Sequence, residues 1–369
     1  MRRCIQLLAF AGIAHAAEIR PWTDVQNRTI EGRMLGLEGD SVILELKDGA
    51  KVLFPLSKLT AADADHARSQ GGEGNFDAPW PDRIKFSEDP EIVVVEENAA
   101  EKRFVYESAS YRYTCDVRLS KSVVKGFAVM FEATRLFCRS LPLGLDGGGG
   151  EGKLRIHLFE THEAYVEAGG QQDTAGIFLP GKSEVLVPLT SLGVRPVGSG
   201  YMLDRDKSSS TLPHELTHQL TPVAYMRQAS MIWFIEGIAE YVAATPYRSG
   251  AFNVRNHFRD IVESVTGEGG RQIQLPALRA FMLQSHGDFM KEARTNYRAA
   301  LLITCYFMQM DGEGDAKRLK TYLRALRKGK DREESLAALL DGRDFEELEK
   351  EIAKAWSRRG IDLFFDVGH

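Results

Sequence analysis

Two histidines and a glutamate in one short segment make the strongest chemical signal in the sequence. His214, Glu215 and His218 form a His-Glu-x-x-His motif. Residues four positions apart lie on one face of a helix, a single turn from each other. Both imidazoles can therefore bind the same Zn²⁺ ion, and the glutamate between them can reach a water ligand of that ion. The motif predicts attack of water on a polarised carbonyl, most often that of a peptide bond.

A second acidic segment provides the ligand that two histidines alone leave missing. Residues 230–244 predict a mostly apolar helix, and Glu236 and Glu240 lie on one face of it, one turn apart. A carboxylate in apolar surroundings is costly unless its charge is compensated. We therefore expect Glu236 to be the third zinc ligand and Glu240 to accept the second N–H of a ligating histidine. The sequence predicts one Zn²⁺ per chain, with Glu215 as the general base.

The opposing interpretation is a solvated helix face, on which the histidines cap the helix or pair with surface carboxylates. Trp233, Phe234 and Ile238 flank the two glutamates and would then be exposed to water as well. These apolar neighbours therefore favour the zinc site.

Turn signals and periodicity predict the elements that position these residues. Residues 208–211 offer N-cap side chains for the helix that carries His214, and Pro222 ends that helix. Gly237 lies where a close helix contact would leave no room for a side chain. After residue 208 the chain is expected to be helical almost to its end. Upstream, the patterns predict helices over 120–139 and 161–168 and strands over 104–117, 153–159, 175–179 and 183–188. The expected fold class is α+β, with a mixed sheet first and a helical part second.

The segment 18–66 predicts a small β module of its own. Alternating apolar and polar residues predict strands over 28–37, 41–46 and 51–55, separated by Gly- and Asp-containing turns. A module of this size is expected to be barrel-like. Glycines follow it, and residues 67–86 are expected to link it to a second domain over 87–369.

The His-Glu-x-x-His motif and the segment 236–241, Glu-Gly-Ile-Ala-Glu-Tyr, together resemble the paired motifs of the gluzincin metallopeptidases. The likeness is closest to the peptidase MA-like proteins of uncharacterised bacterial families and spans about residues 87–369. It implies a zincin-like peptidase domain in which Glu236 is the third zinc ligand and Glu215 the general base. It also implies that an edge strand lines the substrate cleft. The candidates for that strand are Ala175, Gly176, Ile177 and Phe178.

The resemblance further implies a hydrogen-bond donor opposite the metal, often a tyrosine on a later helix. Tyr297 is the residue that we expect in this role, because it lies on a downstream predicted helix. Tyr241, Tyr306 and His286 compete with it. Arg298, the next residue, either binds a substrate carboxylate or is an exposed helix arginine.

The N-terminal module resembles SLA1 homology domain 1, a small SH3-like barrel. The likeness rests on residues 20–23, 36–42 and 52–60, followed by Asp63. In eukaryotic members this domain is a peptide-binding adaptor. A second hypothesis is therefore a peptide- or envelope-binding adaptor protein, in which this module carries the function and the metallopeptidase-like domain is a scaffold. The alternative is that the N-terminal module is a structural appendage without a binding function of its own.

Composition and charge limit the class of protein. The chain has 369 residues, of which 43% are hydrophobic and 27% charged, as expected of a folded protein with one large or two unequal domains. A formal net charge of −5 and the lack of a long basic run argue against a nucleic-acid partner. The expected partners are a peptide or protein substrate and a peptide ligand of the N-terminal module.

The first residues predict export. Residues 1–16 combine a basic start, a short apolar run and a small-x-small cleavage site, which is typical of a signal peptide. The protein is therefore expected in the periplasm, at the cell surface or in the medium. No later segment has about 18 consecutive apolar residues, so no transmembrane helix is expected in the mature chain.

Three cysteines, Cys115, Cys138 and Cys305, remain after removal of the signal peptide. An odd number leaves at least one thiol free or paired with another chain. Two outcomes stay open: a disulfide between Cys115 and Cys138, as an oxidising compartment allows, or three buried, unpaired thiols.

Overall fold

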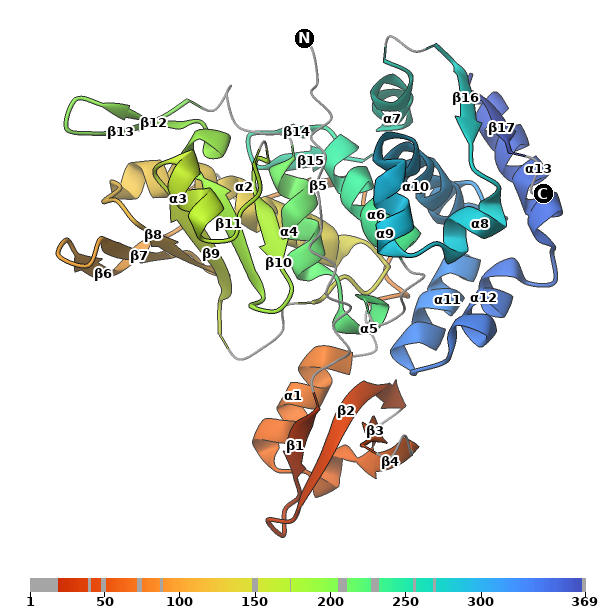
Figure 1. Cartoon of the computed structure of the whole chain (residues 1–369), viewed down its shortest axis with the longest axis horizontal. Helices are drawn as coiled ribbons and strands as arrows, with labels where there is room; N and C mark the ends of the chain where they lie inside the picture. Colours follow the sequence, from red (N-terminus) through yellow and green to blue (C-terminus); the bar gives the residue numbers. More distant parts are fainter. Residues whose placement is uncertain are drawn as a thin grey trace.

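The chain folds into sheets and helices in both its N-terminal and its larger C-terminal part, in agreement with the expected mixture of α and β structure (Figure 1). The structure, a computed structural model, describes residues 19–38, 41–47, 51–71, 75–86, 89–147, 152–172, 174–204, 211–226, 232–254, 257–267 and 270–366. The predicted signal peptide, 1–16, lies outside these residues. None of the helices among them is long and apolar enough to cross a membrane.

A six-stranded mixed sheet is the framework of the larger part. Its strand order is β10-β11-β9-β8-β7-β6, in which β8, β9 and β11 run parallel and the other neighbours are antiparallel. The strands are β6 (Val93–Asn98), β7 (Arg103–Glu107), β8 (Tyr111–Cys115), β9 (Leu154–Phe159), β10 (Ile177–Leu179) and β11 (Glu184–Pro188). The predicted strands over 153–159 and 183–188 are therefore confirmed, and the one over 175–179 is confirmed from Ile177 onward.

Helices cover both faces of this sheet. On one face lies α2 (Lys121–Ser140), which begins at Ser120, whose side chain accepts a hydrogen bond from the backbone N–H of Val123. The apolar spacing of α2 turns Phe127 and Phe131 onto the sheet, where their rings lie 5.4 and 5.3 Å from the ring of Tyr113. On the other face, α3 (His162–Glu167) packs against the β10 end of the sheet.

The predicted single strand over 104–117 is wrong, because it is a hairpin of β7 and β8. The chain reverses at Ser108 and Ser110. The buried carboxylate of Glu132, on α2, accepts hydrogen bonds from the Ser108 hydroxyl at 2.7 Å and from the Ser110 backbone N–H at 2.7 Å. A tertiary contact thus stabilises a turn that carries neither glycine nor proline, which is why local turn signals missed it.

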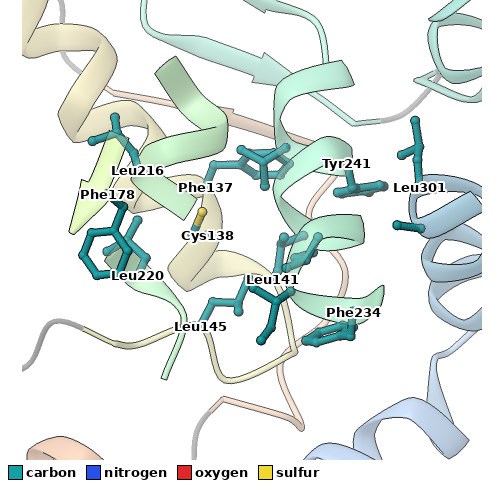
Figure 2. Packing of buried hydrophobic residues seen from close by; sticks show 14 of the residues in the cluster. Phe137, Cys138, Leu141, Leu145, Phe178, Leu216, Leu220, Phe234, Tyr241 and Leu301 are labelled. Atoms are coloured by element: carbon teal, nitrogen blue, oxygen red, sulfur yellow. The ribbon is translucent and has the colours of Figure 1, made fainter. Parts of the chain in front are cut away.

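The second half is mainly helical, as predicted, and its centre is α6 (Ile232–Ala244), which packs between α4 (Leu212–Leu220) and α10 (Ala293–Gln309). A Cβ atom at Gly237 would lie 2.1 Å from Thr304 Oγ1 and 2.4 Å from the Ala300 carbonyl oxygen. The close helix contact predicted at Gly237 is therefore present. Figure 2 shows side chains of α2, α4 and α6, among them Phe137, Leu216 and Phe234, in one apolar core.

Further helices and strands surround α4, α6 and α10. The helices are α5 (Val223–Met226), α7 (His257–Thr266), α8 (Leu278–Leu283), α9 (His286–Lys291), α11 (Lys317–Arg327), α12 (Arg332–Leu340) and α13 (Phe345–Ser357). Short strands that the sequence did not predict lie among them or shortly before them. They are β12 (Val194–Val197), β13 (Gly200–Leu203), β14 (Tyr247–Arg248), β15 (Ala251–Asn253), β16 (Gln272–Leu275) and β17 (Asp362–Phe365). Runs of two to four residues are too short for periodicity to detect.

The N-terminal part is a four-stranded antiparallel sheet with the order β1-β2-β3-β4. The strands are β1 (Arg20–Thr23), β2 (Thr29–Glu38), β3 (Ser41–Leu46) and β4 (Lys51–Pro55), which confirms the three predicted ones. Among the described residues no ladder joins β1 to β4, so the expected barrel is not closed by strand pairing. The sheet and α1 (Ala61–Gly71) enclose a small core of their own around Trp22.

The expected linker, 67–86, is packed along much of its described length. Its first residues continue α1. Phe76 is 2% exposed and belongs to the core of the larger part. The side chain of Asn75 donates to the Arg139 carbonyl at 2.6 Å, and Asp77 forms an ion pair with Arg324 at 2.9 Å. β5 (Arg83–Lys85) then joins the sheet β14-β15-β5. The described part of this segment is therefore packed against the larger part of the protein and is not a free linker.

Cys115, Cys138 and Cys305 are buried, unpaired thiols, and Cys115 and Cys138 form no disulfide. Burial raises the pKa of Cys115 and of Cys138 to about 12. Burial also raises the pKa of Cys305 well above its ordinary value. Thiols of this kind stay protonated near neutral pH and are poor nucleophiles, so none of them is a candidate for catalysis.

Candidate metal centre

The helix that carries the two histidines is buried along its whole length. α4 begins after Thr211, whose side chain makes no capping hydrogen bond, and contains Pro213 in its first turn. Residues 208–210, the other expected caps, lie outside the described residues. The backbone N–H of Thr221 donates to the His218 carbonyl, and the helix ends before Pro222, as predicted. Since α4 packs against α2, α6 and β10, both imidazoles are turned into the protein.

The imidazoles of His214 and His218 converge with the carboxylate of Glu236 on one point. The two Nε2 atoms lie 2.9 Å apart. Oε2 of Glu236 lies 3.3 Å from Nε2 of His214 and 3.5 Å from Nε2 of His218. Each of the three residues is at most 1% exposed, and their ligand atoms lie within 4.8 Å of one another. The three residues that the sequence singles out as ligands are thus brought together.

These residues fit a metal ion by the chemistry of their donor atoms. Oε2 of Glu236 is buried and lies at ion-pair distance from both rings, yet no described residue donates a hydrogen bond to it. Two imidazole nitrogens and one carboxylate oxygen are a ligand set that Zn²⁺ uses in catalytic sites, where a fourth position stays open. A buried cluster of this kind, capable of holding a metal ion, is therefore present.

The electrostatics of the cluster also favour a cation. Burial opposes charge on His214, but Glu236 and Glu240 outweigh it and raise the pKa of that imidazole well above its ordinary value. Burial likewise opposes charge on Glu236, and the two imidazoles outweigh it and lower the pKa of the carboxyl far below its ordinary range. A proton and a metal ion therefore compete for the same buried place.

Glu240 occupies the place that the sequence predicts for it, one turn beyond Glu236 on α6. Its Oε1 lies 3.0 Å from Nδ1 of His214, the ring nitrogen on the far side from the cluster. The side chain is 32% exposed, so it borders the buried site rather than belonging to its centre. A carboxylate in this position orients the ring and selects the tautomer whose Nε2 is free to bind a metal.

Glu215 is held by the edge strand of the six-stranded sheet. Its Oε2 accepts a hydrogen bond of 2.9 Å from the backbone N–H of Phe178, in β10. Burial raises the pKa of Glu215, although the charges of His214 and His218 act to lower it. The sequence placed Phe178 in the candidate substrate strand but did not predict this contact, because a main-chain donor leaves no side-chain signature.

The candidate substrate strand is shorter than expected and begins at Ile177. Ala175 and Gly176 precede it, and all three residues are buried. Ile177 packs with Tyr165 under α3. β10 is an edge strand, because β11 is the one strand among the described residues to which it is hydrogen-bonded. Since Phe178 turns its N–H toward Glu215, the free edge of β10 faces the side on which α4 lies.

Tyr297, on α10, lies next to the cluster. Its ring centroid is 6.1 Å from that of His214, with an angle of 62° between the rings, and Phe289 packs edge-on against it at 5.1 Å. Burial and the charge of Glu236 raise the pKa of Tyr297 well above its ordinary value. His286, at the start of α9, is half-buried, and its pKa is lowered by burial while the charge of Glu236 acts to raise it.

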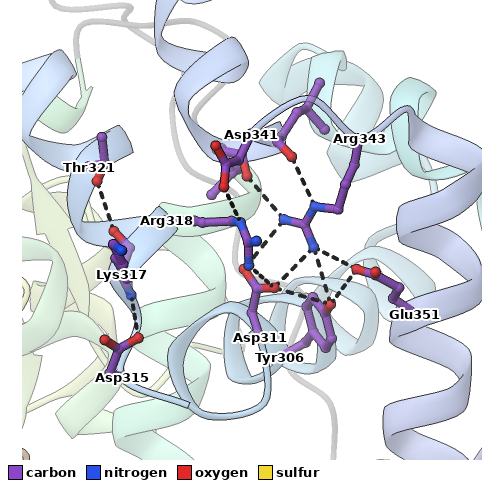
Figure 3. A network of polar contacts seen from close by, with 11 residues as sticks. Tyr306, Asp311, Asp315, Lys317, Arg318, Thr321, Asp341, Arg343 and Glu351 are labelled. Atoms are coloured by element: carbon purple, nitrogen blue, oxygen red, sulfur yellow. Dashed lines mark hydrogen bonds and ion pairs between the residues drawn. The ribbon is translucent and has the colours of Figure 1, made fainter. Parts of the chain in front are cut away.

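The other tyrosine candidates are engaged elsewhere. Tyr241 is buried and its hydroxyl accepts a hydrogen bond from Nε2 of Gln309 at 3.1 Å. Figure 3 shows Tyr306 in a separate ionic network with Asp311, Arg343 and Glu351. Arg298 is half-buried rather than exposed, and it forms no ion pair with a described residue.

Comparison with known proteins adds no relative. No family model, no curated protein and no solved structure matches this chain. The likeness to the gluzincins and to SLA1 homology domain 1 therefore rests on the sequence motifs, and the interpretation of the site rests on its own geometry.

Proposed function

We propose that the protein is an exported zinc-dependent metallopeptidase of the gluzincin type. The observation that carries the proposal is the buried convergence of His214, His218 and Glu236, with Glu215 hydrogen-bonded to the edge strand beside them. The proposal includes a zincin-like domain over residues 87–369, an SH3-like module over 18–66 and a signal peptide over 1–16.

His214, His218 and Glu236 would hold Zn²⁺. When bound, the ion would supply Lewis-acid polarisation of the scissile carbonyl and would lower the pKa of water toward about 7. Glu215 takes the proton of the attacking water and later delivers it to the leaving amine. The raised pKa of Glu215 suits this role, because it makes the carboxylate a stronger base toward the attacking water.

The substrate is proposed to be an extended peptide that lies along the free edge of β10. Main-chain hydrogen bonds to the edge strand hold such a peptide with little regard to its side chains. The hydroxyl of Tyr297 donates to the oxygen that becomes negatively charged during the attack. Glu240 keeps the ring of His214 in its orientation.

The first test replaces the base and leaves the ligands in place. Glu215→Gln is expected to bind as much zinc as the natural chain and to lose hydrolysis of casein by a factor of about 10²–10⁴. Zinc is measured by mass spectrometry of the purified protein, and His218→Ala is the control that should lose the metal. Hydrolysis at an undiminished rate would refute the base assignment. Zinc at one ion per chain without cleavage of any peptide would favour the adaptor hypothesis instead.

A further inference from the structure

An open hollow on the outer face of the sheet β14-β15-β5 carries an excess of positive charge. Its volume is about 660 Å³. The lining contains the cationic residues Arg83, Lys85 and Arg248, together with Asn253 and the acidic residue Asp82. All five are exposed. The hollow belongs to neither the candidate metal centre nor the N-terminal sheet.

The register of the three strands explains why the cations lie together. Arg248 is opposite Ala251, Ala251 is opposite Lys85, and Asn253 is opposite Arg83. Directly opposed residues share a face of a sheet, and so do residues two positions apart on a strand. The three cationic side chains therefore project from one face. The small side chain of Ala251 lies between them on that face and leaves space for a ligand.

The opposite face of the same sheet is part of the core. Phe252 and Ile84 are opposed in the alternate register and point inward, and Tyr247, which also borders the hollow, packs on the Phe252 ring at 5.0 Å. Phe252 is fully buried, and its ring stacks on Phe137 of α2 at 4.6 Å. The cationic face is thus held on a fixed support and does not depend on a mobile loop.

Two of the three cations of this face, Arg83 and Arg248, are not balanced by a nearby carboxylate among the described residues. Neither Arg83 nor Arg248 forms an ion pair with a residue that the structure describes. Exposed arginines elsewhere do form such pairs, as Arg118 does with Glu97 at 2.9 Å. Because the whole chain carries a net charge of −5, the local excess does not follow from composition.

We propose that this hollow binds a short acidic segment of a protein partner. Guanidinium groups pair with carboxylates through two parallel hydrogen bonds, and the Asn253 amide can bond to a peptide backbone. The volume suits a few residues of an extended chain. Asp82 disfavours a uniformly anionic strand such as a nucleic acid, and a concave surface does not match a flat bilayer. This proposal is independent of the peptidase activity proposed for the metal centre.

The test measures binding of a labelled peptide to the full chain. Fluorescence anisotropy is recorded with fluorescein-Gly-Asp-Glu-Glu-Gly and with its neutral counterpart, fluorescein-Gly-Asn-Gln-Gln-Gly, and mass spectrometry verifies that both peptides stay intact. The acidic peptide is expected to bind and the neutral one to bind at least tenfold more weakly. Arg83→Gln combined with Arg248→Gln should weaken binding of the acidic peptide about tenfold, since two exposed charge pairs are worth about 1.4 kcal/mol together. Asp82→Asn should strengthen it.

The matched control combines Arg279→Gln with Arg332→Gln, which removes the same charge from two exposed positions outside the hollow. This control is expected to leave the affinity unchanged. Equal weakening by both double variants, equal binding of both peptides, or no binding up to about 1 mM would overturn the proposal. Binding of phosphatidylserine vesicles that Arg83→Gln with Arg248→Gln abolishes, without binding of the peptide, would also overturn it in favour of a lipid surface.

Discussion

At the residue scale, Glu215 joins the two parts of the candidate site. Its carboxylate accepts a hydrogen bond from the backbone N–H of Phe178, so the proposed base is attached to the strand proposed to hold the substrate. A shift of β10 would therefore move the base as well. The sequence predicted the ligands and the base from side-chain spacing, but a main-chain contact has no such spacing. The contact between Phe178 and Glu215 consequently emerged from the structure alone.

Tyr297 gives the sharpest prediction at this scale. Tyr297→Phe is expected to lower kcat for a peptide substrate about 10²–10³-fold, because one donor to the developing oxyanion is lost. KM and the zinc content should change little. Tyr241→Phe is the control, since its hydroxyl bonds to Gln309 in the core. If Tyr297→Phe kept the natural kcat, another residue would have to donate this hydrogen bond. His286→Ala would then be the variant to measure.

At the element scale, α6 is the helix on which the site depends. It carries Glu236 and Glu240 on the side of α4 and presents Gly237 to α10. Sequence periodicity predicted α2 and the strand β9, whereas α4 was predicted from its cap candidates and Pro222, and α6 from its apolar composition. Periodicity failed at the β7–β8 hairpin, where Glu132 stabilises the turn from another element. It also failed at the short strands β12 to β17.

Gly237 supports a prediction about this helix contact. Gly237→Ala should destabilise the protein by about 1–3 kcal/mol, because the added methyl group would overlap Thr304 and Ala300. Zinc affinity should fall as well, since α6 would have to move away from its place. The measurement is urea denaturation. Gly287→Ala, on the exposed surface of α9 with 3.8 Å to its nearest atom, is the control and should be neutral or slightly stabilising. Equal stability of the two variants would contradict the packing argument.

At the scale of the whole molecule, two separate cores are joined by the segment that follows α1. The N-terminal sheet packs around Trp22, whereas Phe76 lies in the core of the larger part. The guanidinium groups of Arg324 and Arg327 lie over the ring of Phe76 at 4.8 and 5.7 Å. Composition predicted a linker here, because glycines precede Phe76. The attachment could not be predicted, because the two arginines that lie over Phe76 are some 250 positions away in the sequence.

Phe76→Ala tests this attachment. Removal of a buried phenylalanine ring is expected to cost about 3–5 kcal/mol of stability. It should also make the chain near residues 75–78 accessible to a protease, which would release the N-terminal sheet as a fragment. Thermal unfolding and limited proteolysis followed by mass spectrometry are the measurements. Phe364→Ala is the control, because Phe364 is 50% exposed. Unchanged proteolysis of Phe76→Ala would show that other contacts hold the two parts together.

Spacing along the sequence was enough to single out the side chains of the candidate metal centre. His214, Glu215, His218, Glu236 and Glu240 could be identified because helical periodicity converts spacing along the chain into a shared face. Tertiary structure alone decided how the two helices face each other, which main-chain group holds the base, and that Arg83, Lys85 and Arg248 share a cationic face. These features arise from contacts between segments far apart in the sequence, and such contacts depend on packing, which local patterns do not encode.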